Sequence, residues 1–112
     1  MRIMIVDDNE GMREAIKGML ASSDIEFCEC EDGGQAISQY SQFSPDWVLM
    51  DLSMAYVDGI SALTELKAMY PEARVIIVTD YDDQSFRNQA KEAGAEWYLL
   101  KENLQEIRTV IA

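Results

Sequence analysis

Four short apolar stretches in this sequence each end in a polar residue, and this pattern constrains the fold more than any other feature. The stretches are residues 3–6, 48–50, 75–78 and 97–100, and the polar residues that follow them are Asp7 with Asp8, Asp51, Thr79 and Lys101. A short apolar run is typical of a strand that is buried in a parallel sheet. Because parallel strands point their C-terminal ends to one edge, we expect these polar side chains to meet in a single site.

The segments between these stretches show the periodicity of amphipathic helices. After the first stretch, Asp8 or Asn9 can cap a helix whose apolar residues recur three and four positions apart, at Met12, Ala15, Ile16, Met19 and Leu20. Residues 25–30 are expected to form an edge strand. Four more helices are expected: one after the turn Asp32-Gly33-Gly34, one from about Asp58 to Pro71, one between Thr79 and Gly94, and one after Lys101. The helix after Thr79 should be the loosest, because Phe86 is its only large apolar anchor.

Five strands that alternate with five helices predict an α/β fold. The arrangement that fits best is a flavodoxin-like, doubly wound (βα)5 sandwich with a five-stranded parallel sheet of order 2-1-3-4-5. A chain of 112 residues is the length of one domain, so we expect residues 1–112 to form a single unit. In this strand order, the first and third strands lie side by side, and a ligand should bind where they end.

The composition excludes several classes of function. A net charge of −12, from 21 acidic and 9 basic residues, would repel nucleic acid, so we expect no direct binding to DNA or RNA. The sequence has neither the roughly 20 apolar residues of a membrane span nor a signal peptide, which favours a cytoplasmic protein that does not bind membranes. The absence of histidine removes Ser/His/Asp and Cys/His catalysis. Cys28 and Cys30 lack the further soft ligands of a metal site and are interpreted as reduced structural residues.

The polar residues at the strand ends predict phosphoryl-transfer chemistry. Three carboxylates, from Asp7, Asp8 and Asp51, would repel one another unless a cation offsets their charge, and Mg²⁺ is the cation that suits such oxygen ligands. Lys101 and the Thr79 hydroxyl would then contact the oxygens of a phosphate. Asp51 would act as the nucleophile and become an acyl phosphate. Each residue alone also has an ordinary structural explanation, as a helix cap or a solvated charge, but their occurrence at successive strand ends favours a site.

These residues lie in motifs that resemble a known family over the whole chain. The motifs are Asp7-Asp8-Asn9, residues 45–54 around Asp51, Asp58-Gly59, Thr79, and residues 94–101 ending in Lys101. In order and spacing they closely resemble the receiver domain of two-component response regulators. The receiver fold that the resemblance implies has the 2-1-3-4-5 strand order predicted above.

The resemblance implies a role in a phosphorelay for each residue of the site. A sensor histidine kinase or a phosphotransfer protein would donate a phosphoryl group from a phosphohistidine to Asp51. Asp8, Asp51 and the backbone carbonyl of Ser53 would bind Mg²⁺, and Asp7 would act through water. Thr79 and Lys101 would contact the phosphate, and Thr79 and Tyr98 would form the switch. The chain would therefore be a signalling phosphoacceptor that assists its own phosphorylation and dephosphorylation, and not an enzyme acting on other substrates.

The resemblance also suggests how the signal leaves the site. The face formed by the helix after Thr79, the strand 97–100 and the last helix would carry the response to an effector or a second copy, while the first helix, around Met12 and Arg13, would dock the kinase. The residues before and after Lys101 resemble receivers joined to helix-turn-helix output domains, which suggests transcription regulation. If the chain belongs to a longer regulator, we expect the output domain to follow the short last helix.

Four positions depart from the usual receiver pattern. Ala55 replaces the proline that commonly follows Met54 in receivers, and Glu102 replaces the proline that often follows Lys101. Trp97 replaces a common glycine. Asp80 takes the place of a small residue after Thr79, and its charge could slow phosphotransfer if the side chain points toward the site.

Three alternatives stay open on the sequence alone. A flavodoxin-like cofactor-binding module would need a loop after the first strand that cradles phosphate, which Asp7-Asp8 would repel. A small Mg²⁺-dependent phosphatase would need a general acid and a substrate pocket, and neither is visible. A receiver that has lost phosphorylation and serves only as an interaction module is favoured by Asp80 alone.

Overall fold

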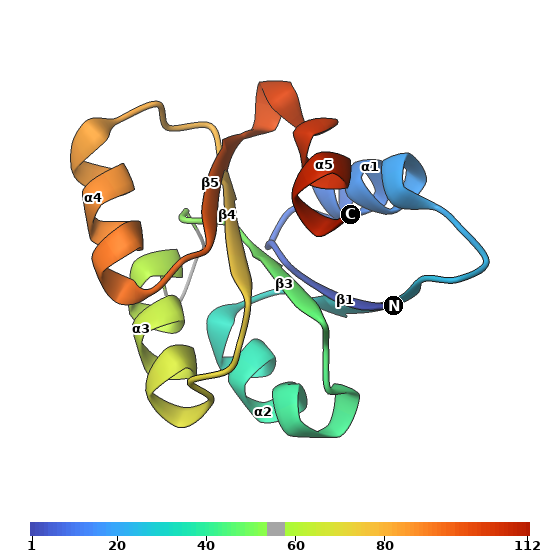
Figure 1. The fold of residues 1–112 in the computed structure, drawn as a ribbon, viewed down its shortest axis with the longest axis horizontal. Helices are drawn as coiled ribbons and strands as arrows, with labels where there is room; N and C mark the ends of the chain where they lie inside the picture. Colours follow the sequence, from blue (N-terminus) through green and yellow to red (C-terminus); the bar gives the residue numbers. More distant parts are fainter. Residues whose placement is uncertain (54–57) are drawn as a thin grey trace.

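The computed structural model describes residues 1–53 and 58–112 and shows strands and helices in strict alternation (Figure 1). The elements are β1 (Arg2–Val6), α1 (Glu10–Leu20), β2 (Glu26–Cys30), α2 (Gly33–Phe43), β3 (Trp47–Met50), α3 (Gly59–Met69), β4 (Val75–Thr79), α4 (Gln84–Ala93), β5 (Trp97–Leu100), the 3₁₀ turn η1 (Lys101–Asn103) and α5 (Glu106–Ile111). Each predicted strand and helix is present, with bounds that differ from the sequence prediction by a few residues.

One parallel sheet organises the described part of the chain. Its strand order is β2-β1-β3-β4-β5, which confirms the predicted doubly wound, flavodoxin-like topology. The register places Val6, the last residue of β1, beside Met50, the last residue of β3. Asp7 and Asp51 therefore follow directly from two neighbouring strand ends.

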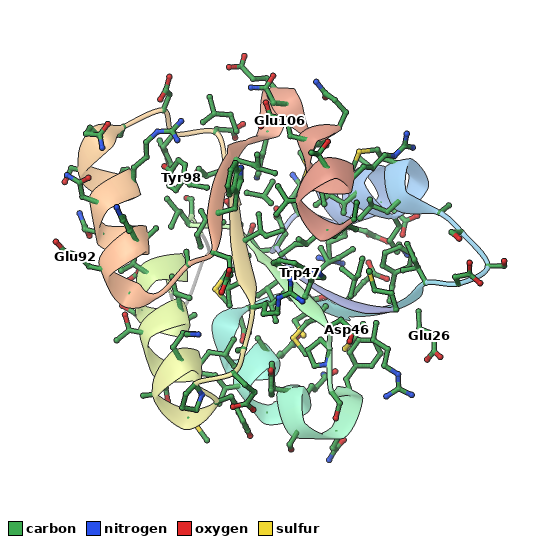
Figure 2. All side chains as sticks on the ribbon, viewed as in Figure 1. Glu26, Asp46, Trp47, Glu92, Tyr98 and Glu106 are labelled. Atoms are coloured by element: carbon green, nitrogen blue, oxygen red, sulfur yellow. The ribbon has the colours of Figure 1, made fainter. Side chains whose placement is uncertain are left out.

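The helices cover both faces of the sheet and enclose two apolar clusters. Helices α2, α3 and α4 lie on one face, whereas α1 and α5 lie together on the other (Figure 1). Strand β1 serves both clusters, because successive side chains of a strand point to opposite faces: Met4 and Val6 contact the first cluster, and Ile3 and Ile5 the second. Figure 2 shows Trp47 inside the molecule and Glu26 and Glu92 pointing outward. Cys30 is buried and Cys28 is half-buried, and both are free thiols in contact with the first cluster, as expected.

Side-chain caps fix where the helices begin. Asn9, Asp32, Asp58 and Asp83 each occupy the N-cap position and accept a hydrogen bond from the backbone N–H three residues later. Gly94 ends α4 with φ of 104°, a left-handed conformation that a residue without Cβ adopts at little cost. These caps confirm the predicted helix starts at Asn9 and Asp58 and the predicted end at Gly94.

The chain after β5 does not form the single helix that the sequence predicted. Lys101 begins a 3₁₀ turn, and α5 starts only at Glu106, so Leu104 precedes the helix that it was expected to join. The N–H of Ile107 donates to the carbonyl of Leu104, three residues back, which is the tighter turn of a 3₁₀ segment. The tight turn lets Lys101 stay at the strand end while Ile107 reaches the core. None of the helices in the described ranges is long and apolar enough to cross a membrane.

Candidate functional site

Three aspartates meet at the carboxyl edge of the sheet. One carboxylate oxygen from each of Asp7, Asp8 and Asp51 lies within 4.8 Å of those of the other two. Asp7 and Asp51 are buried, with 2% and 5% of their surface exposed, whereas Asp8 is exposed and faces solvent. Three carboxylate oxygens at this spacing form the hard, anionic donor set that Mg²⁺ prefers, so the residues fit the predicted metal.

Lys101 brings a positive charge into this group of carboxylates. Its Nζ lies 3.3 Å from Oδ2 of Asp7 and 3.5 Å from Oδ2 of Asp51, and only 12% of its side chain is exposed. The residue is the first of η1, so the end of β5 delivers it to the site as the sequence predicted. One ammonium group thus connects the ends of β1, β3 and β5.

The charges in the site change the acidity of its groups. Burial, followed by the nearby charge of Asp7, raises the pKa of Asp51 from 3.8 to about 6, although Lys101 and the backbone N–H of Ser53 oppose the shift. Burial lowers the pKa of Lys101, but the charges of Asp51 and Asp7 outweigh it and raise that pKa overall. Lys101 therefore stays charged at neutral pH, while Asp51 is held in an unfavourable environment for an anion.

Thr79 and Tyr98 are joined through the loop that follows β4. Thr79 is fully buried at the end of β4, between β3 and β5. Its Oγ1 accepts a hydrogen bond from the N–H of Tyr81 at 3.2 Å, and the carbonyl of Tyr81 accepts one from the hydroxyl of Tyr98 at 2.5 Å. Tyr98 lies on β5, half-buried, and contacts this loop and α4 rather than the carboxylates.

The loop after Asp51 is fixed where it meets α3. Gly59 donates its N–H to the carbonyl of Leu52 at 2.9 Å. A Cβ at Gly59 would lie 2.1 Å from the carbonyl oxygen of Asp51, which explains why glycine occupies this position. Ser53 is exposed and follows Asp51 by two residues, in a place from which its backbone carbonyl was predicted to bind Mg²⁺. The predictions for Met54 and Ala55 lie outside the described residues.

Arg13 has a role that the sequence prediction missed. It was assigned to a kinase-docking surface, but it is buried, with 8% of its surface exposed. Its Nη1 donates to the backbone carbonyl of Asp7 at 2.8 Å, and its Nε donates to Glu29 at 3.0 Å. Arg13 therefore supports the turn that carries the first aspartate. Its position three residues before Ile16, on the apolar face of α1, is the sequence signal that could have indicated burial.

Comparisons with known proteins identify the family of this chain. The family model of the response regulator receiver domain matches residues 3–112. The chain belongs to this family. The chain is therefore a receiver domain of the two-component response regulator type.

The chain covers different shares of the named relatives that it matches. The chain is 42% identical over 101 residues to the chemotaxis protein CheY of Bacillus subtilis, a match that covers 89% of this chain and 84% of CheY. It is 36% identical to the transcriptional regulatory protein DegU of Brevibacillus brevis, over 90% of this chain but 44% of DegU. The crystal structure of a LuxR-family two-component response regulator from Aurantimonas sp. SI85-9A1 superposes with a TM-score of 0.91 at 32% identity, covering 98% of this chain and 81% of that one.

Proposed function

We propose that the receiver accepts a phosphoryl group on Asp51, with Mg²⁺ held by Asp8, Asp51 and the Ser53 carbonyl and by Asp7 through water. The donor would be a phosphohistidine on a sensor histidine kinase or a phosphotransfer protein. The observation that carries the proposal is the buried Asp51 carboxylate, which lies within reach of the Lys101 ammonium and beside the carboxylates of Asp7 and Asp8. When bound, Mg²⁺ would offset the negative charge of the carboxylates and the phosphoryl oxygens.

The protein groups would perform the transfer as follows. An oxygen of Asp51 attacks phosphorus, the new O–P bond forms as the P–N bond to the donor histidine breaks, and the bonding electron pair leaves with the nitrogen. Lys101, charged at neutral pH, attracts the incoming oxygens and then pairs with the product. The Thr79 hydroxyl donates a hydrogen bond to a phosphoryl oxygen. No outside substrate is turned over, so the domain acts as a phosphoacceptor and not as an enzyme.

The signal would leave through the face of α4, β5 and α5. A pocket of about 560 Å³ lies on this face, and it is lined by charges of both signs, with Arg87 and Lys91 from α4 and Glu106 from α5. Trp97, one of the departures from the family pattern, lines it and is 52% exposed. Mixed charge beside an exposed indole supports contact with an effector or a second copy of the domain.

The output would be regulation of transcription. The similarity to DegU supports this, because DegU is named a transcriptional regulatory protein and this chain covers 44% of its length. The similarity to a two-component response regulator of the LuxR family also supports it. A chemotaxis role is the second candidate, and the 42% identity to CheY favours it. Recording whether the full gene product carries a DNA-binding domain would separate the two.

The proposed acceptor can be tested with a small phosphodonor. Incubation with acetyl phosphate and Mg²⁺ should add the mass of one phosphoryl group to the intact protein, and peptide mapping should place it on Asp51. Omitting Mg²⁺ should prevent the addition, and the product should decay by hydrolysis because acyl phosphates are labile. Lys101→Ala should react more slowly. Modification at another residue, or at equal rates without Mg²⁺, would contradict the proposal.

Asp80 is expected to slow this reaction. It is exposed, yet its negative charge contributes to the raised pKa of Lys101, so the site experiences its field. The repulsion between one such charge and the negative charge of an approaching phosphoryl group amounts to roughly a few tenths of a kcal/mol or more. Asp80→Ala should therefore react roughly two- to fivefold faster than wild type with acetyl phosphate. Glu92→Ala, which removes an exposed charge from α4, serves as the control. Equal rates in Asp80→Ala and wild type would show that the charge of Asp80 is screened by solvent.

A further inference from the structure

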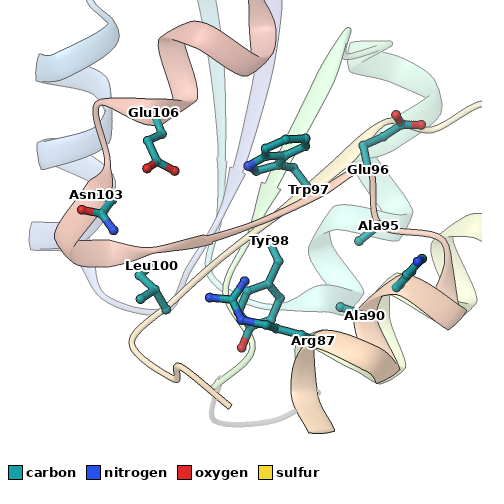
Figure 3. A pocket seen from close by; sticks show the side chains of 10 residues that line it. Arg87, Ala90, Ala95, Glu96, Trp97, Tyr98, Leu100, Asn103 and Glu106 are labelled. Carbon is teal, nitrogen blue, oxygen red and sulfur yellow. The ribbon is translucent and has the colours of Figure 1, made fainter. Parts of the chain in front are cut away.

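The side chain of Arg87 connects three parts of the structure near Tyr98. Its guanidinium carbon lies 4.6 Å from the centroid of the Tyr98 ring, at a distance typical of a cation–π contact. Its Nη2 also forms an ion pair with Asp82 at 3.2 Å, and 34% of the side chain is exposed. Figure 3 shows Arg87, on α4, in front of the Tyr98 ring, while the neighbouring Trp97 points to the opposite side of β5. Arg87 thus joins α4, the loop after β4 and β5.

Tyr98 is held at both ends of its side chain. Arg87 covers the ring, and the hydroxyl donates to the carbonyl of Tyr81. Tyr81 in turn donates its N–H to Oγ1 of Thr79. A run of contacts therefore leads from Arg87 through Tyr98 and Tyr81 to Thr79, whose strand ends beside the acceptor strand.

This arrangement suits a phosphoryl group at Asp51. In its bond with Tyr81, the Thr79 hydroxyl acts as an acceptor. A hydroxyl can donate one hydrogen bond and accept two, so this bond leaves the proton of Thr79 for a phosphoryl oxygen. Whatever holds Tyr98 and Tyr81 in place also holds Thr79 in an orientation that can donate.

We infer that Arg87 is a positioning residue, which clamps Tyr98 and so favours the arrangement in which Thr79 receives the phosphoryl group. The inference rests on the proposed function of Asp51. Coupling between two sites is reciprocal, so a contact that stabilises the receptive arrangement tightens phosphoryl binding by the same factor. A cation–π contact at a partly exposed site corresponds to a change of about two- to fivefold in an equilibrium constant.

The clamp can be tested with beryllofluoride, a stable mimic of the phosphoryl group. Wild type, Arg87→Met and Lys91→Met would be titrated with beryllofluoride in the presence of Mg²⁺, with tyrosine rings labelled with ¹³C for NMR. Lys91 lines the same pocket one turn further along α4, is exposed, and carries the same charge. Arg87→Met should weaken beryllofluoride binding about two- to fivefold and shift the ring signal of Tyr98, assigned by its loss in Tyr98→Phe. Lys91→Met should leave both unchanged.

Repeating the Arg87 substitution in a variant that lacks the Tyr98 ring distinguishes a clamp on Tyr98 from a general effect of charge. In Tyr98→Leu, replacing Arg87 by Met should cause no further loss of affinity, because the ring that Arg87 holds is absent. A loss of the same size in that background, or equal affinities of wild type and Arg87→Met, would overturn the role of Arg87. Failure of the wild-type chain to bind beryllofluoride would instead overturn the proposed function of Asp51, and the two failures are therefore distinguishable.

Discussion

Asp51→Asn is expected to abolish phosphorylation completely and, at the same time, to make the domain more stable at neutral pH. The loss follows because the amide cannot form an acyl phosphate. The gain follows because the carboxylate is buried beside Asp7 and its pKa is raised from 3.8 to about 6. An acid whose pKa is higher in the folded state ionises more readily when the chain is unfolded, so its ionisation favours unfolding.

The sign and the range of pH follow from these two values. Below about pH 3.8, Asp51 is protonated in both states and does not affect the free energy of unfolding. As the pH rises from about 3.8 to about 6, the unfolded chain loses the proton first and stability falls; above about 6 the penalty is constant. The difference between these two pKa values corresponds to about 3 kcal/mol at neutral pH, or roughly 10 to 15 °C in melting temperature for a domain of this length.

Thermal denaturation of both proteins between pH 4 and 8 would measure this effect. The melting temperature of Asp51→Asn should exceed that of wild type at pH 7, and the difference should become small near pH 4. Mg²⁺ should raise the melting temperature of wild type more than that of the variant, since it binds the folded carboxylates. Glu92→Gln, which removes an exposed charge, should change little. A variant less stable than wild type at pH 7 would show that the ionised carboxylate is stabilised by its surroundings.

Gly59→Ala is expected to be the most damaging small substitution in the loop region near the acceptor. A Cβ at this position would lie 2.1 Å from the carbonyl oxygen of Asp51 and 2.7 Å from Cα of Leu52. Both are backbone atoms, which cannot rotate away as a side chain can. The start of α3 must therefore move away from the loop, or the loop must move and displace Asp51. Overpacking typically destabilises a protein by about 1 to 3 kcal/mol, and a clash with backbone atoms belongs at the upper end of that range. We therefore expect a lower melting temperature and slower phosphorylation in the same variant.

Gly18 provides a matched control for this substitution. It also lies within a helix, but a Cβ there would meet no atom within 4 Å. Alanine is favoured over glycine in a helix by about 1 kcal/mol, so Gly18→Ala should raise the melting temperature slightly and leave phosphorylation unchanged. If Gly59→Ala behaved like Gly18→Ala, the close approach of α3 to the acceptor loop would not matter for either property.

The fold and the convergence of the site could be predicted because both depend on local sequence patterns. Apolar runs define the strands, parallel strands share an edge, and Asp7, Asp51 and Lys101 must then meet. The burial of Arg13 and the contact of Arg87 with Tyr98 depend instead on how helices pack against a particular strand or loop. The spacing of Arg13 from Ile16 indicates on which face of α1 it lies, but the groups that the long, flexible side chains of Arg13 and Arg87 contact are not encoded by any periodicity.

The sparse burial of α4 has a consequence for how receivers of this kind diverge. Among the ten residues of α4, all of them described, Ala90 is buried, while most of the others face solvent. Substitutions on a solvent-facing helix usually change stability by less than about 0.5 kcal/mol. After gene duplication, this helix can therefore accumulate changes that alter which partner a copy recognises while the acceptor and the sheet stay intact, so sister pathways can become insulated without losing their shared chemistry.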